Sequence, residues 1–169
     1  MIVVAGALIF TRLFTPVVSP VKIVEPLPPL VSNEAREYKN LLLRFSLVYP
    51  KDLTVREYDD GTSASTITFE DAREGKSFQI FVVPYKEEYI TGEQFKKDIP
   101  SGIIEEATDI VIDGVRATVF FSKDNILGDT REVWFIKDGF LFEITTRREL
   151  DSWLAALMKS WRFDPYPDR

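Results

Sequence analysis

The chain has 169 residues, of which 45% are apolar and 13% aromatic, so it can fill a core and is not disordered throughout. It contains neither cysteine nor histidine, which excludes a disulfide framework, a zinc–thiolate site and every nucleophile that depends on a histidine base. The formal net charge is −6 and the basic residues form no stripe, so we expect no nucleic-acid partner.

Residues 1–15 form an apolar segment that indicates a membrane anchor. Residues 2–10 carry no polar side chain, but Arg12 interrupts the run at about half of the roughly 20 residues that a membrane-spanning helix needs. Three interpretations stay open: part of an anchor helix that starts upstream of Met1, a short signal segment, or a cytosolic N-terminal strand. No cysteine follows the segment, so we expect no lipoprotein anchor.

Residues 16–34 form a linker that is rich in proline: Pro16, Pro20, Pro26, Pro28 and Pro29. This density disfavours both helix and central strand and predicts a stiff, extended spacer. An apolar segment, a spacer and a folded domain are the layout of a membrane-tethered extracytoplasmic module, which is the interpretation we favour. The alternative is a soluble cytoplasmic protein with a disordered apolar tail.

Residues 35–164 are expected to form one domain, followed by a tail at 165–169. At the start of the domain, residues 32–40 predict a helical turn capped by Ser32 or Asn33. Strands with alternating apolar residues come next, separated by Pro50 and by turns at 59–61 and 71–75. The predicted strands cover residues 45–49, 53–58, 65–70 and 76–83.

The second half of the domain begins with a short helix. Thr91 and Gln94 fit a capping box, Ile90 and Phe95 fit a hydrophobic staple, and the helix should stop before Pro100. Hairpin turns are predicted at 113–114 and 137–139, and a loop at 123–129. The strands around them are expected at residues 104–112, 115–122, 130–136 and 140–145.

The last predicted element is a helix that starts at a second capping box, Thr146 and Glu149. Its apolar stripe has helical spacing and comprises Leu150, Trp153, Leu154, Leu157, Met158 and Trp161. The strands at 76–83 and 130–136 are apolar on both faces and need cover on both sides. The sequence therefore predicts an α+β fold with a central antiparallel sheet sandwiched by helices.

Five short motifs resemble the PsbP-like family, which is named after the extrinsic protein of photosystem II: FSLVYP at 45–50, LTV at 53–55, DGVRA at 113–117, DGFLFEI at 138–144 and LMKSWRF at 157–163. The resemblance covers residues 38–164 and implies a PsbP-like α/β/α sandwich. It departs from the family at Arg44, where relatives often have Gly, and at Leu53, where many have Trp. The family includes small bacterial exported or lipid-anchored proteins, so the resemblance implies a non-enzymatic accessory or binding module. It carries no functional residue onto this chain.

Acidic residues near two turns are candidates for calcium binding or carboxylate chemistry. The first set is Asp59, Asp60, Glu70 and Asp71, and the second is Asp124, Asn125 and Asp129. Neither set has the spacing of a known calcium loop, and we favour turn and solvation roles. Every Asp and Glu has a turn, cap or strand-surface explanation, so we predict no catalytic residue, no metal and no cofactor.

Aromatic residues are the other candidates. Trp134, Trp153 and Trp161 are interpreted as core residues. Phe81 and Phe120 face away from the main apolar sets of their strands, so they would mark a partner site if the helices left them uncovered. Tyr85 and Tyr89 are loop aromatics of similar interest: loops carry binding residues more often than strands do.

We expect a non-catalytic extracytoplasmic accessory or binding domain that is tethered to the membrane by its N-terminal segment and has a protein or small-ligand partner. One alternative is a carboxylate-based enzyme or calcium-binding protein. Another is a soluble cytosolic adaptor, because the PsbP-like fold is similar to that of a Ran-binding nuclear import factor.

Overall fold

A computed structural model describes residues 34–59, 61 and 63–164. The apolar segment 1–15, the linker up to residue 33 and the tail 165–169 lie outside the described residues, so the expectations for them stay predictions. Within the described part of the chain, no helix is both long enough and apolar enough to cross a bilayer.

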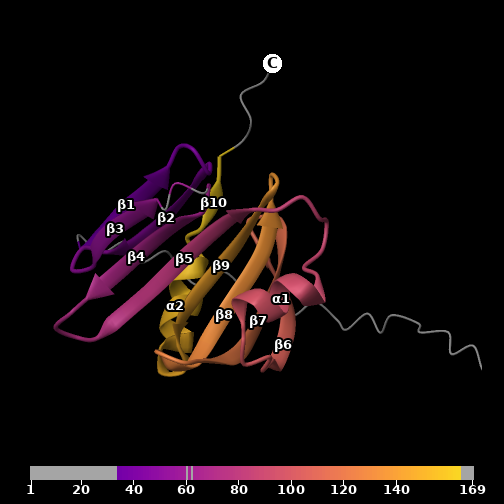
Figure 1. Ribbon diagram of the computed structural model, residues 1–169. Helices are drawn as coiled ribbons and strands as arrows, with labels where there is room; N and C mark the ends of the chain where they lie inside the picture. Colours follow the sequence, from indigo (N-terminus) through magenta and orange to yellow (C-terminus); the bar gives the residue numbers. More distant parts are fainter. Residues whose placement is uncertain (1–33, 60, 62, 165–169) are drawn as a thin grey trace, which may run out of the picture.

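The described residues form ten strands, two α-helices and one 3-10 helix (Figure 1). The first half contains β1 (Ala35–Asn40), β2 (Phe45–Pro50), β3 (Thr54–Asp59), β4 (Ser65–Asp71), β5 (Lys76–Pro84) and α1 (Gly92–Asp98). The second half contains β6 (Glu105–Ile112), β7 (Val115–Asp124), β8 (Gly128–Lys137), β9 (Phe140–Arg147), η1 (Arg148–Leu150), α2 (Asp151–Met158) and β10 (Arg162–Phe163).

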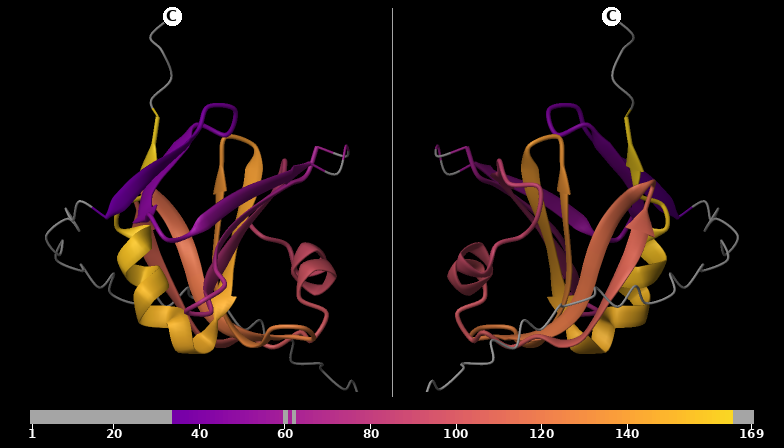
Figure 2. Two further views of the ribbon diagram at one scale, coloured as in Figure 1. Left: turned by 90° about the vertical axis from the view of Figure 1, so that its left-hand side faces the viewer. Right: turned by 90° about the vertical axis from the view of Figure 1, so that its right-hand side faces the viewer.

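A seven-stranded antiparallel sheet forms the middle layer, in the order β3-β4-β5-β9-β8-β7-β6. A second sheet, in the order β1-β2-β10, lies with α2 on one side of it, and α1 lies on the opposite side (Figure 2). The prediction of an α+β fold with a central antiparallel sheet between helical layers is thus confirmed. The small three-stranded sheet was not predicted.

The main core fills the space between the large sheet and the layer formed by α2 and the small sheet. Inward-facing side chains alternate along β4, β5, β8 and β9, as the period of two requires. The largest fully buried side chains in this core are Trp161, Phe45, Phe69, Phe135 and Phe142. Stacked and edge-to-face ring pairs join Phe45, Phe135, Phe142 and Trp161, so these rings form an aromatic centre within a core that is otherwise largely aliphatic.

The predicted helical turn at residues 32–40 is wrong, because residues 35–40 form β1. This segment has local helix formers, but antiparallel pairing with β2 satisfies its backbone and places Tyr38 edge-on to Phe69 at 5.4 Å. Asn40 ends the strand, since its Oδ1 accepts from the Leu43 backbone N–H at 2.8 Å. Long-range pairing has overridden local propensity here.

The predicted boundaries of the last helix are also wrong. β9 continues to Arg147, and the Thr146 hydroxyl donates to the Ser77 carbonyl at 2.6 Å instead of capping a helix. α2 ends at Met158, where Ser160 turns the chain: its hydroxyl donates to the Leu157 carbonyl and accepts from the Val48 N–H. Trp161 therefore lies in the turn after the helix. The predicted loop at 123–129 is shorter, because β7 reaches Asp124 and β8 resumes at Gly128.

Candidate functional site

The side of the large sheet that faces α1 carries a small second core. Phe120 on β7 and Trp134 on β8 are buried there beneath Phe95 of α1, with ring centroids 5.5–5.8 Å apart. Ile90 and Phe95, the predicted staple, both pack against this cluster. α1 therefore covers β7 and β8 on this face of the sheet.

The start of α1 is held by side-chain hydrogen bonds. The Thr91 hydroxyl accepts from the Gln94 backbone N–H at 3.1 Å, as the capping box predicted. The reciprocal bond is made differently, because the Thr91 N–H donates to the Tyr85 hydroxyl at 3.0 Å while Gln94 donates its amide to Asp98. Tyr85 is thus a buried structural residue that positions α1.

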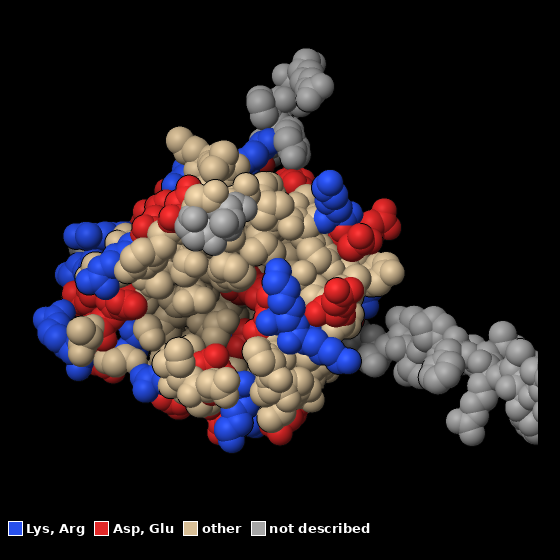
Figure 3. Space-filling view, in the orientation of Figure 1, with Lys and Arg blue, Asp and Glu red and all other residues tan. Residues whose placement is uncertain are grey.

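Beyond α1, the same face of the sheet becomes polar and open. Glu143 on β9 lies between Trp134 on β8, which is under the helix, and Phe81 on β5, which is half-buried. Figure 3 shows a hollow in this region beside α1, with acidic side chains and, next to them, basic ones along the edge nearer the helix. The polar residues that the register places on this face of β4, β5 and β9 are Thr66, Thr68, Glu70, Ser77, Gln79, Glu143, Thr145 and Arg147.

Two glutamates on this face are almost completely buried: Glu132 is 2% exposed and Glu143 is 6% exposed. Glu132 is hydrogen-bonded, because its Oε2 accepts from the Thr145 hydroxyl at 2.7 Å and from the Trp134 indole N–H at 3.3 Å. Burial nevertheless raises the pKa of Glu132 above its ordinary value, since a charged carboxylate is costly in an apolar site.

Glu143 is the more perturbed of the two. Burial raises the pKa of Glu143 to about 9, and a hydrogen bond with Asp98 of α1 together with the charges of Asp98 and Glu132 acts in the same direction. Lys97 opposes the shift. Glu143 is therefore a neutral acid near pH 7 that donates to Asp98, while its buried Oε1 finds no partner among the described residues. We call Asp98, Glu132 and Glu143 the acidic cluster.

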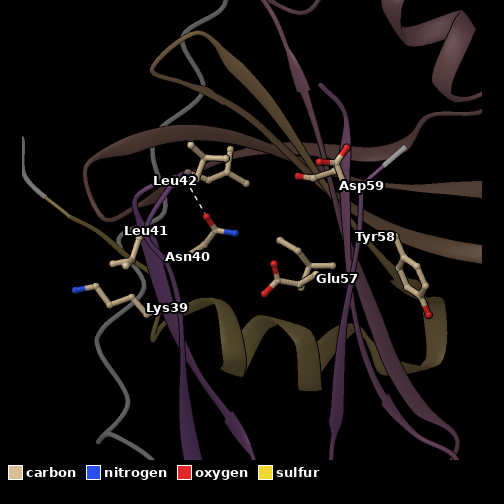
Figure 4. Close-up of a pocket in the computed structure, with 10 residues that line it drawn as sticks. Lys39, Asn40, Leu41, Leu42, Glu57, Tyr58 and Asp59 are labelled. Carbon is tan, nitrogen blue, oxygen red and sulfur yellow. Dashed lines mark hydrogen bonds between the residues drawn. The ribbon is translucent and has the colours of Figure 1, made fainter. Parts of the chain in front are cut away.

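A second concavity of about 430 Å³ lies between the β1–β2 turn and β3 (Figure 4). Glu57, which lines it, accepts a hydrogen bond from the Tyr38 hydroxyl at 2.9 Å, and burial raises the pKa of Tyr38. Leu41 and Leu42 are exposed at its rim. The lining residues are Lys39, Asn40, Leu41, Leu42, Leu43, Glu57, Tyr58, Asp59, Ser65 and Ile67. Both of its carboxylates, Glu57 and Asp59, already accept a hydrogen bond, so the acidic cluster is the stronger candidate.

The first predicted acidic set is not brought together. Asp59 pairs with Ser65 at one end of the β3–β4 hairpin, whereas Glu70 pairs with Thr54 at the other. Glu70 forms an ion pair with Arg56 at 2.7 Å, and Asp71 accepts from the Arg73 N–H in the following turn. Asp60 lies outside the described residues.

The second predicted set also has turn roles. Asp124 Oδ1 accepts from the backbone N–H groups of Ile126 and Leu127, both at 2.7 Å, and Asp129 lies 3.7 Å from Lys123. Asn125 lies in the same turn. Across the part of the chain that the structure describes, no three or more acidic residues are placed to hold a metal ion.

The aromatic candidates differ in whether they are buried or exposed. Trp134, Trp153 and Trp161 pack in or against the two cores, as predicted. α1 covers Phe120, which is 3% exposed, so Phe81 and Phe120 do not form one exposed patch. Of the two loop tyrosines, Tyr85 is buried, while Tyr89 is 69% exposed.

Sequence reasoning missed the acidic cluster, and the strand-surface interpretation is wrong for Glu132 and Glu143. The signal was present in EVWFI and FLFEI, where one carboxylate interrupts a strand that is apolar on both faces. A charge in such a strand must be buried, paired or neutralised. The sequence does not show that Asp98, 45 positions before Glu143, lies next to Glu143 in the fold.

No family model and no curated protein matches the sequence. Its structure, however, is similar to the solution structure of cyanobacterial PsbP (CyanoP) from Synechocystis sp. PCC 6803, with a TM-score of 0.57. The match covers 88% of this chain and 99% of that chain at 12% sequence identity. Likeness at this identity concerns the fold, and the fold that the sequence motifs implied is the one observed: the chain has the PsbP-like fold.

Proposed function

We propose that the chain is a non-catalytic accessory domain that binds a ligand or partner on the α1 side of its large sheet. The observation that carries this proposal is the likeness to CyanoP over nearly the whole length of both chains, because the PsbP-like fold is generally an accessory fold. The open half of the α1 face adds a place for binding. Two carboxyl groups of this face, Glu132 and Glu143, are buried and form no ion pair among the described residues.

We further propose that the domain works outside the cytoplasm, held at a membrane by residues 1–15 through the proline-rich linker at 16–34. The layout of the sequence supports this location, and the likeness to CyanoP is in keeping with it. The test is protease protection in the native host. In intact cells stripped of any outer envelope, we expect protease added from outside to degrade the domain. We also expect deletion of residues 1–15 to release the domain from the membrane fraction. Protection until the cells are lysed would contradict the proposal and favour the cytosolic adaptor.

The binding role is tested by crosslinking in the native host. A photoreactive residue in place of Gln79, which is exposed on the open half of the α1 face, should capture a partner. The matched control is the same residue in place of Lys159, which is exposed at the end of α2 on the other side of the sheet. Equal capture at the two positions would show that this face is not the binding surface.

A carboxylate-based enzyme is the second candidate, because two buried carboxyl groups with raised pKa values meet at one face. A general acid–base pair, however, works with one raised and one ordinary pKa, and burial raises the pKa of both glutamates here. This favours binding over catalysis. Hydrolysis of a glycoside or ester panel by the purified protein, abolished by Glu132→Gln, would reverse the preference.

A further inference from the structure

We propose that the hollow beside α1 binds a primary ammonium group on an aliphatic chain, with Glu143 and Asp98 as its hydrogen-bond acceptors and Phe81 beside its apolar stem. The inference deepens the proposed binding function and rests on it. It names the ligand's chemical class: an alkylamine or a lysine-like side chain.

Among the described residues, no cation forms an ion pair with the acidic cluster. Each ion pair found among the described residues uses other carboxylates, and the described hydrogen bonds of Asp98 come from the Gln94 amide and from Glu143. Lys97, the neighbour of Asp98 on α1, is exposed. Two carboxyl groups thus meet without an ion pair, and the exposed Lys97 only partly offsets the effect of burial on Glu143. A ligand cation would complete this site.

One buried carboxyl oxygen of the acidic cluster lacks a hydrogen-bond partner among the described residues. Glu143 is 6% exposed, yet its buried Oε1 has no hydrogen-bond partner among the described residues. Buried carboxyl oxygens in native proteins nearly always have a partner, so one that lacks it needs an explanation. Glu132 is different, because Thr145 and Trp134 already donate to it. The unsatisfied oxygen therefore belongs to Glu143, on the edge of the area that α1 covers.

The residues beside Glu143 decide which ligands can reach it and which fit. Phe81 on β5 pairs with Glu143 on the side away from α1, and its ring is half-buried. Gln79, two residues before Phe81 on the same strand, is exposed on the same face. Figure 3 shows that this part of the face opens to the surface as a hollow. An ammonium group offers three donors, and its methylene stem can lie on an aromatic ring, which also attracts the charge. A metal ion would need several more oxygens than are arranged here.

Binding of a cation changes the protonation of Glu143. Glu143 is neutral near pH 7. The charged groups near it are Asp98 and Lys97 of α1 and Glu132 of β8, while the neighbouring residues of β5, Phe81 and Gln79, are uncharged. An ammonium ion that takes its place between Glu143 and Asp98 stabilises the charged form of Glu143, so the carboxyl proton leaves to solvent. Binding at pH 7 therefore releases about one proton per cation bound.

The experiment uses the full chain in detergent and 1,5-diaminopentane as the probe, with 1,5-pentanediol as its uncharged counterpart. Calorimetric titrations at pH 7 in two buffers of different ionisation enthalpy give both affinity and proton release. We expect saturable binding of the diamine only. Glu143→Gln, which keeps the shape of the neutral acid, should weaken binding at least tenfold and abolish proton release. Glu93→Gln, which removes one exposed charge from the same helix, should change affinity less than twofold.

Three results would overturn the inference: no saturable binding of the diamine, equal binding of the diol, or equal weakening by the two Glu→Gln variants. Failure here leaves the accessory role and the location outside the cytoplasm standing, since those depend on protease protection and crosslinking in cells. Conversely, protection of the domain from external protease would contradict the location outside the cytoplasm but would not bear on amine binding by the purified chain.

Discussion

Trp161 stacks on Phe45, with ring centroids 4.3 Å apart and ring planes within 7° of parallel. The two residues are separated by 116 positions, and both are fully buried. Phe142 of the large sheet meets both rings edge-on. The three rings therefore pack β2 of the small sheet and the turn after α2 against β9 of the large sheet.

Replacing Trp161 by alanine should be the most destabilising single change in the main core. A fully buried tryptophan that is truncated leaves a large cavity, so we expect a loss of about 3–5 kcal/mol in the free energy of unfolding. Urea denaturation followed by far-ultraviolet circular dichroism measures it. Tyr89→Ala removes an exposed ring and should cost no more than about 0.5 kcal/mol. Equal losses in the two variants would show that the Phe45–Trp161 stack does not carry the core.

The sheet and its hairpins could be predicted from the sequence because their signals are local. Alternation of apolar residues marks β4 and β5, and the Asp113–Gly114 and Asp138–Gly139 pairs both adopt the positive φ values that tight hairpin turns require. β1 could not be predicted in this way. Its residues favour helix locally, and only the pairing with β2 makes it a strand.

The acidic cluster depends on a relationship that no local pattern contains. Glu143 is buried because α1 crosses the neighbouring strands and brings Asp98 above it. Where a seven-residue helix lies on a sheet is decided by the packing of Phe95 on Phe120 and Trp134, which are 25 and 39 positions away. A sequence can show that a carboxylate interrupts an apolar strand, but it does not show what covers that carboxylate.

A matched pair of glycine substitutions tests the hairpin turn. Gly114 has φ +81° and open space where a Cβ would be added, so Gly114→Ala meets only the cost of the left-handed conformation, about 1–2 kcal/mol. Gly92 begins α1 without a positive φ and also has open space, so Gly92→Ala should stabilise by about 0.4–1 kcal/mol. Thermal unfolding of the two variants should shift in opposite directions, and shifts of the same sign would refute this assignment.

Phe95→Ala should detach α1 from the sheet without unfolding the main core. Phe95 contacts Phe120 and Trp134, which belong to the second core, whereas Trp153 and Trp161 belong to the first. We expect a loss of about 2 kcal/mol, a red shift of the Trp134 emission and a fall of the Glu143 pKa as water reaches it. Trp134→Phe in the same background should abolish the red shift. A shift that persists would come from the main core and contradict separate packing of α1.

Glu143 should make the protein less stable as the pH rises. Its pKa is about 9 when folded against an ordinary 4.5, so between these values the unfolded chain ionises and the folded one keeps its proton. The free energy of unfolding should thus fall by about 1.4 kcal/mol per pH unit across this window and level off above it.

The Glu143→Gln variant tests this directly, because glutamine keeps the polar shape and cannot ionise. Urea unfolding between pH 5 and pH 9 should lose most of its slope in Glu143→Gln and keep it in Glu93→Gln, where the carboxylate is exposed. A smaller slope of the same sign should remain from Glu132, whose pKa burial also raises. An unchanged slope in Glu143→Gln would mean that Glu143 is already ionised in the folded state, and the acidic cluster would then be an ordinary solvated surface.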